Sequence, residues 1–193
     1  MTDIKVRRRR GEALREAILG AAWAELTEGG YSSLTLEAVA RRAGTSRPVL
    51  HRRWTNRTEL AAAAMAHHFA LNPVTVPDLG NVRDELAMLL RKLSDRGTPM
   101  MLRLMLEMNE DLARAQSNLS TLKSRVTDRG LIEEILQRGI DRGEIAPEKI
   151  TPRIISLPKD LVRHEAIMTL DGVSDAVIHE ILDQIFLPLV YRV

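Results

Sequence analysis

The 193-residue chain contains no cysteine, which excludes disulfide bonds, thiolate metal sites and thiol chemistry. Aromatic residues make up only 3% of the chain, so a binding pocket built on aromatic stacking is not expected. No apolar run approaches the roughly 18 residues that a membrane span needs, and no uninterrupted apolar stretch follows the basic N-terminus as it would in a secretory signal peptide. These absences predict a cytoplasmic protein with no membrane contact.

Patterns that carry catalysis or metal binding are also lacking. His67 and His68 are adjacent, and adjacent residues on a helix point about 100° apart, so they do not readily share a metal. His164 lacks the second histidine of a zinc-binding helix motif, and the glycines at 29–30 follow no predicted strand, as a phosphate-binding loop would require. We therefore expect neither an enzyme nor a resident metal or cofactor.

Charge is unevenly distributed along the chain. Residues 1–60 hold 12 Lys and Arg against 7 Asp and Glu, whereas the remainder holds 16 against 19. The resulting net charges of +5 and −3 indicate an anionic partner for the N-terminal segment. A run of four arginines near this end either reaches phosphates or a minor groove, or forms a solubilising tail. The run consists of Arg7, Arg8, Arg9 and Arg10.

Residues 34–57 follow the pattern of two short helices joined by a tight turn. Thr35 stands where the first helix needs an N-cap, because its hydroxyl can accept a hydrogen bond from an unpaired backbone N–H. Apolar residues then recur at helical spacing and provide a face to bury. Gly44 suits the end of this helix, since glycine tolerates the left-handed conformation of a C-terminal cap.

The second helix is expected to begin with Ser46 as N-cap and Pro48 in its first turn, where the missing N–H costs little. Leu50 and Trp54 lie four residues apart and are expected to face the core. The residues left outside suit major-groove reading, because arginine bonds guanine and an aliphatic side chain can touch the thymine methyl. A solvated basic helix in a small bundle is the alternative. The outward residues are Arg47, Pro48, Val49, His51, Arg52 and Arg53.

From Ala17 to Leu60 the chain resembles the TetR family of bacterial transcriptional regulators. The Gly30-Tyr31 end of the first helix, the LTLEAVA helix, the AGTSR turn and the LHRRW helix match in order. The Pro48-Val49 pair replaces the commoner Gly-Thr, and His51 stands where Tyr is usual. The resemblance implies DNA contacts at Thr35, Arg47, Pro48, Val49, His51, Arg53 and Arg57.

The rest of the chain shows helical periodicity and no sustained alternation, so the fold class is predicted to be all-α with about nine helices. An N-terminal arm and three-helix helix-turn-helix DNA-binding domain are expected at 1–56. A helical regulatory and dimerisation domain is expected at 57–193, with 57–71 as a connecting helix. The Pro-containing stretch from Asn72 to Gly80 breaks the pattern. The expected helices span 11–28, 57–70, 81–95, 99–112, 117–142, 152–170 and 174–190.

The last two expected helices are apolar enough either to close a monomeric core or to form a dimer interface. The resemblance implies that they pack against their copies as a four-helix interface. A two-fold dimer sets two recognition helices roughly 34–36 Å apart, which predicts a palindromic operator. The interface candidates are Ile154, Leu161, Ile178, Ile181, Leu182, Ile185, Phe186 and Leu189.

The Met- and Leu-rich stretch at 99–112 either lines a pocket or is ordinary core. The resemblance implies a small molecule that enters the second domain and shifts the connecting helix. Methionine adapts to varied ligands, and the scarcity of aromatics favours an apolar, aliphatic or flexible effector. The candidate lining residues are Met101, Leu104, Met105 and Met108.

These observations together favour a homodimeric repressor that a small molecule releases from a palindromic operator. The alternative is a helical small-molecule carrier or interaction module without specific DNA binding. The turn GTSRPVLHRRW distinguishes the two, because a carrier has no need for arginines at an exposed helix start.

Overall fold

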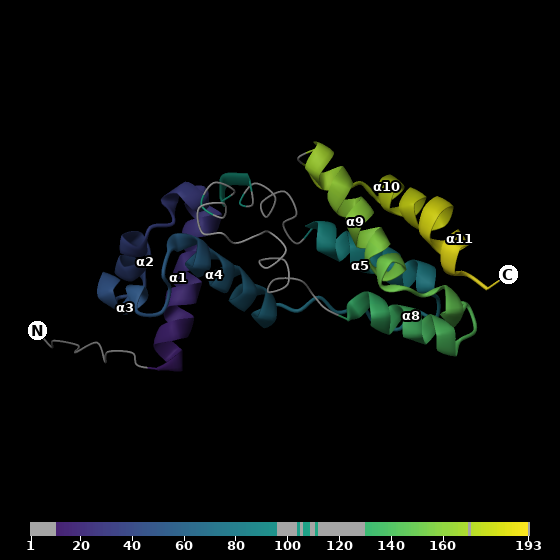
Figure 1. The fold of residues 1–193 in the computed structure, drawn as a ribbon, viewed down its shortest axis with the longest axis horizontal. Coiled ribbons are helices and arrows are strands. Elements are labelled where there is room, and N and C mark those ends of the chain that lie inside the picture. Colours follow the sequence, from purple (N-terminus) through teal and green to yellow (C-terminus); the bar gives the residue numbers. More distant parts are fainter. Residues whose placement is uncertain are drawn as a thin grey trace, which may run out of the picture. The chain divides into compact units, whose positions relative to one another are not determined.

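The computed structural model describes residues 11–95, 104, 106–108, 111, 130–169 and 171–192. Within these ranges the chain forms helices and loops but no strand, and one isolated bridge joins Ile145 and Tyr191 (Figure 1). The predicted all-α class is therefore confirmed for the part of the chain that is described. No helix in that part is both long and apolar enough to cross a membrane.

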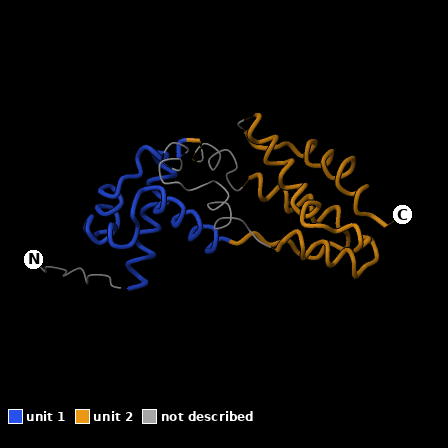
Figure 2. Tube along the Cα trace, in the orientation of Figure 1, with its two compact units in different colours: residues 1–72, 107–126 blue, residues 73–106, 127–193 orange. Residues whose placement is uncertain are grey.

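The chain divides into two compact units (Figure 2). The first contains residues 1–72 and 107–126, and the second contains residues 73–106 and 127–193. The first division falls at the end of Asn72, at the start of the Pro-containing break.

Four helices form the N-terminal part of the first unit: α1 (Glu12–Ser33), α2 (Leu36–Arg42), α3 (Arg47–His51) and α4 (Arg57–Leu71). α1 packs against α4 and α2, and α2 packs against α3. Their core is apolar, and Ile18, Leu26, Leu50 and Met65 are among its buried side chains.

α1 continues past its expected end at residue 28 and reaches Ser33. Gly30 interrupts it with φ +72° and ψ −173°, a backbone conformation essentially restricted to glycine. The break frees the backbone N–H of Tyr31 from the helical pattern, which is important for the contacts described below.

α4 packs against α1 and belongs to the first unit, whereas the sequence pattern groups 57–71 with the second domain. The physical reason is the alanine run of α4. Ala61 and Ala64 have no exposed surface, because small side chains allow α1 to pack closely on this face. The N-terminal stretch of this unit therefore extends to residue 72 rather than ending at residue 56.

The second unit contains α5 (Val82–Asp95), α8 (Leu131–Asp141), α9 (Pro152–Thr169), α10 (Asp175–Glu180), the π-helical turn η2 (Ile181–Phe186) and α11 (Leu187–Val190). A short 3-10 turn, η1 (Pro147–Lys149), precedes α9. α5 contacts α8, α9, α10 and η2, and its buried side chains Leu86, Leu89 and Leu90 join a common apolar core with them.

The helix expected over 117–142 is not continuous. Its described part is α8, which begins at Leu131. Gly130 precedes it with φ +93°, a left-handed conformation that cannot continue a right-handed helix. Residues 117–129 lie outside the described residues.

The expected helices at 152–170 and 174–190 are present. α9 runs through Pro158 as one helix, and Ser174 caps α10 by accepting a hydrogen bond from the Val177 N–H at 3.4 Å. The π-helical turn η2 was not expected, because one widened turn leaves the apolar periodicity almost unchanged.

Candidate nucleic-acid interface

α2 has the caps that its sequence predicts. The Ala38 N–H donates to Thr35 Oγ1 at 3.0 Å, which satisfies one of the helix's unpaired donors. At the other end, Gly44 adopts φ +65° and its N–H donates to the Arg41 carbonyl at 3.3 Å. The Thr45 N–H donates to the Ala40 carbonyl at 2.9 Å, which completes a Schellman motif. The chain therefore turns sharply between α2 and α3.

α3 is anchored by two buried side chains, as expected. Leu50 has no exposed surface and Trp54 is only 6% exposed. α3 itself ends at His51, and the N–H groups of Arg53 and Trp54 both donate to the Leu50 carbonyl at 2.9 Å. The predicted N-cap Ser46 holds the cap position with its backbone carbonyl, while its side chain makes no capping hydrogen bond.

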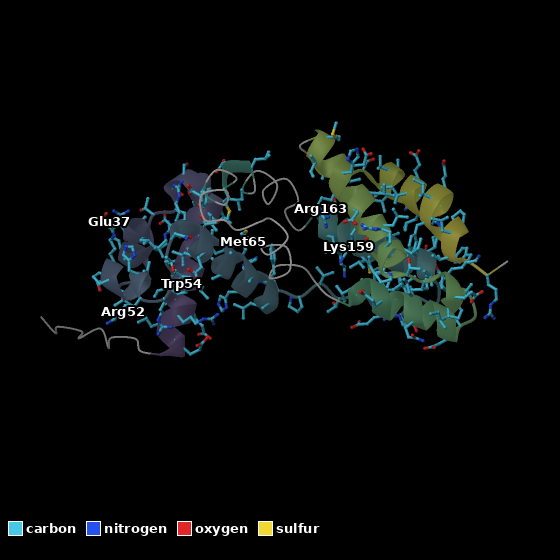
Figure 3. All side chains as sticks on the ribbon, in the orientation of Figure 1. Glu37, Arg52, Trp54, Met65, Lys159 and Arg163 are labelled. Carbon is cyan, nitrogen blue, oxygen red and sulfur yellow. The ribbon has the colours of Figure 1, made fainter. Side chains whose placement is uncertain are left out.

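The opposite side of α3 carries the predicted DNA-reading residues. In Figure 3, Arg52 lies at the outer edge of the unit and Trp54 lies further inside. Among the described residues, none of the three arginines at and after this helix forms an ion pair with a carboxylate. The exposed residues are Arg47, Pro48, His51, Arg52 and Arg53, and Val49 is half-buried beside them. A cluster of cations without internal counter-ions is suited to an external polyanion.

Arg42 is an instructive contrast, because its charge is used inside the unit. Its Nε donates to Glu25 and its Nη1 to Glu28, both at 2.8 Å. The hydrogen bond to Glu28 is the main reason that the pKa of Arg42 is raised, and it lowers the pKa of Glu28 in turn. These ion pairs link α2 to α1, and α3 in turn packs against α2.

Two further predicted DNA contacts have internal partners. Thr35 is exposed and uses its oxygen as the α2 cap, which leaves its hydroxyl proton available to a phosphate. Arg57 was expected to face DNA, but its Nε donates to Asp111 Oδ2 at 2.6 Å. The predicted arm Arg7, Arg8, Arg9 and Arg10 lies outside the described residues.

The Arg57 contact belongs to a network centred on the buried Tyr31. The Tyr31 hydroxyl lies 2.7 Å from Thr58 Oγ1 and donates to Asp111 Oδ2 at 2.8 Å. The Tyr31 N–H, freed by the break at Gly30, donates to Glu107 Oε2 at 2.9 Å. Burial raises the pKa of Tyr31, and the Asp111 carboxylate raises it further, while the Thr58 hydrogen bond opposes them. Sequence reasoning missed this network, since nothing local to Asp111 indicates a partner 80 residues away.

The predicted dimer residues fall into two groups. Four of them pack in the core of this chain and leave almost no surface for a second copy: Ile178, Ile181, Leu182 and Phe186. The prediction treated the whole apolar stripe as one face, whereas one side of that stripe packs against α5 and α9. Ile185 and Leu189 remain 41% and 46% exposed, and Ile154 and Leu161 are half-buried.

The predicted pocket residues are only partly described. Leu104 and Met108 are helical and buried, and Met101 and Met105 lie outside the described residues. Across the described ranges, no group of three or more metal-ligating side chains lies close enough together to hold an ion.

A capped helix, a sharp glycine turn and a short anchored helix with outward arginines define a helix-turn-helix DNA-binding regulator. Family comparison extends this identification over most of the chain. The model for bacterial regulatory proteins of the tetR family matches residues 18–64, and the tetracyclin repressor-like C-terminal domain matches residues 76–185. The chain therefore belongs to the TetR family of transcriptional regulators.

Individual relatives agree with this assignment. A DNA-binding transcriptional repressor TetR of Mycobacteroides abscessus is 29% identical over 191 residues, covering 94% of this chain and 96% of the relative. A helix-turn-helix-type transcriptional regulator of Mycobacterium tuberculosis is 30% identical over 175 residues, covering 86% and 83%. The crystal structure of a TetR family transcription regulator shares the fold, with a TM-score of 0.67, 24% identity and coverage of 89% and 98%.

Proposed function

We propose that this regulator is a homodimeric repressor that binds a palindromic operator through α3 and leaves it when a small molecule binds the second unit. The observation that carries the proposal is the set of exposed arginines at and just after α3, which have no carboxylate partner among the described residues: Arg47, Arg52 and Arg53. Repression is favoured by the similarity to a relative that is named a transcriptional repressor.

A dimer is favoured by apolar side chains that remain exposed at the end of the chain. Ile185 and Leu189 lie four residues apart on the C-terminal helical stretch, and Ile167 and Met168 are exposed on α9. Exposed aliphatic surface of this kind is stabilised when a second copy covers it. A two-fold axis through such an interface repeats α3 in two half-sites, which is the reason for proposing a palindrome.

The effector is proposed to be a small, apolar molecule. The supporting residues are the buried Leu104 at the end of the second unit's first stretch and the buried Met108, which the division of the chain places in the first unit. Methionine side chains repack around differently shaped ligands, and the few aromatics favour an aliphatic or flexible molecule over a stacked planar one.

Selection of bound sequences from a random pool of duplex DNA tests the proposal. We expect enrichment of a two-fold symmetric motif, and an affinity that falls linearly with salt on a double-logarithmic plot. If the chain is instead a carrier or interaction module, no sequence should be enriched at physiological salt, and that outcome would contradict the proposed repressor function.

A further inference from the structure

The first turn of α4 is held by a carboxylate that the DNA-binding function does not explain. Asp111 Oδ2 accepts hydrogen bonds from Arg57 Nε at 2.6 Å and from the Tyr31 hydroxyl at 2.8 Å. The Arg57 guanidinium also lies over the Tyr31 ring, 4.4 Å from its centroid. The Arg57 side chain is 41% exposed and Asp111 is 18% exposed, so the pair lies at the edge of the unit.

Arg57 is well placed to meet an external anion. It is the first residue of α4, directly after the N-cap Asn56, whose Oδ1 accepts from the Glu59 N–H at 2.8 Å. The start of a helix favours negative charge, because the unpaired N–H groups point outward there. Only the short turn after Trp54 separates this point from the DNA-reading residues of α3.

A carboxylate and a phosphate are acceptors of the same kind for a guanidinium. The Arg57 Nε that donates to Asp111 is not available to a phosphate, and the Asp111 carboxylate already neutralises the Arg57 charge. While Asp111 holds Arg57, the unit neutralises one phosphate fewer, and the carboxylate charge itself repels DNA. Release of Asp111 leaves the buried Tyr31 hydroxyl with a partner, because Thr58 Oγ1 stays 2.7 Å away. Both states of the contact therefore satisfy the buried polar group.

We propose that Asp111 competes with a DNA phosphate for Arg57, so that this carboxylate lowers the DNA affinity of the first unit. The chain passes from the second unit into the first between Leu106 and Glu107, a few residues before Asp111 in the sequence. The inference deepens the proposed function and rests on DNA binding by α3.

Glu107 offers a matched control within the same segment. Its carboxylate accepts a hydrogen bond from the backbone N–H of Tyr31 at 2.9 Å. Glu107→Gln removes one negative charge and keeps an oxygen acceptor for that N–H. Asp111→Asn makes the same change in charge at the position that holds Arg57. The two variants therefore separate the loss of the Arg57 ion pair from the loss of a negative charge elsewhere in the unit.

The test measures DNA affinity of the full chain by fluorescence anisotropy between about 50 and 200 mM salt, with the selected duplex and with a mixed-sequence duplex. We expect D111N to bind more tightly at low salt. For each additional phosphate that the variant neutralises, its affinity should fall about threefold more than that of the wild type across this salt range, as counterion release predicts. Arg57→Ala should abolish this difference, so that R57A/D111N behaves like R57A. E107Q should follow wild type.

The competition is contradicted if the salt dependence of D111N equals that of the wild type. It is also contradicted if D111N increases DNA affinity equally in the R57A background, or if E107Q increases DNA affinity as much as D111N does. Helix content and melting temperature establish that each variant is folded, and Asp111→Ser replaces D111N if that variant is not. If no sequence is enriched from the random pool, the operator proposal fails while the mixed-sequence duplex still reports on Arg57.

Discussion

The side chains around α3 have two roles: buried ones anchor the helix, and exposed ones are proposed to read DNA. Leu50 and Trp54 are buried and hold the helix in place, while Arg47 and Arg53 are exposed. Because these roles are on different faces, substitutions should separate folding from DNA binding. Loss of a reader should leave the free energy of unfolding nearly unchanged, since exposed substitutions usually alter stability by only about 0.5 kcal/mol.

Arg47→Ala and Arg53→Ala are each expected to weaken binding to the selected operator by about 1–3 kcal/mol, the range for a bidentate base contact. The measurement is anisotropy at fixed salt, with thermal melting in parallel. Arg153→Ala is the control, because Arg153 is an exposed arginine of the second unit. If both α3 variants keep wild-type affinity, the assignment of the reading face is wrong.

The buried tyrosine offers a test of the Asp111 contact that needs no DNA. Burial raises the pKa of Tyr31 above its ordinary value of about 10, and the Asp111 carboxylate adds to the shift. The neutral form is therefore favoured by folding. Its stabilisation is fully present below about pH 10 and is lost as the pH rises toward the folded-state pKa.

Tyrosinate absorbance, followed over the pH range in which the helix signal is constant, should titrate at lower pH in D111N than in wild type. A neutral amide no longer disfavours the phenolate, while it still accepts the hydroxyl hydrogen bond. E107Q should titrate with wild type. Coincident wild-type and D111N curves would contradict the Tyr31–Asp111 hydrogen bond.

At the scale of helices, glycine positions decide where regular structure stops. Gly30 and Gly20 lie in the same helix but in different environments. Gly30 has φ +72°, and a Cβ built there would meet a Glu107 carboxylate oxygen at 3.3 Å. Gly20 is helical, exposed, and has nothing within 4 Å of a built Cβ.

Gly30→Ala is expected to destabilise the protein by about 1–3 kcal/mol, because alanine must adopt a glycine-only conformation. Gly20→Ala should instead stabilise it by about 0.5–1 kcal/mol through higher helix propensity. Chemical denaturation followed by circular dichroism measures both. Equal effects of the two substitutions would show that the break at Gly30 is not a feature of the folded chain.

Much of the fold could be predicted at this scale, and the failures have identifiable causes. Helical spacing and caps such as Thr35, Gly44 and Ser174 placed α2, the turn and α10, because these signals are local in the sequence. The break at Gly130 lies within a longer apolar pattern that continues on either side, whereas the break at Gly30 lies just past the expected end of the first helix at residue 28. The contact of Asp111 with Arg57 depends on the tertiary fold, and no local pattern specifies it.

For the molecule as a whole, the exposed pair Ile185 and Leu189 is the candidate dimer surface. Their substitution by Glu should weaken self-association by about 2 kcal/mol or more, because an unpaired charge would be buried in the interface. The monomer should stay folded, since both side chains are exposed in it. Gln184→Glu, at an exposed neighbouring position, is the control for added charge.

Sedimentation velocity checks this expectation, together with operator affinity at low protein concentration. Loss of the dimer should reduce operator binding, because two half-sites are no longer bound by one particle. If both Glu variants self-associate as strongly as the wild type, the dimer interface does not include Ile185 and Leu189. By contrast, Phe186→Ala should cost about 3–5 kcal/mol of folding stability, because Phe186 is fully buried in the core of the second unit.

The central claim is that the exposed arginines at and just after α3 read a defined DNA sequence. The most direct measurement is the affinity of the full chain for its selected duplex relative to a scrambled duplex at physiological salt. The account predicts a preference of about 10³-fold or more, the lower bound for specific DNA recognition. Equal affinity for the two duplexes would contradict it.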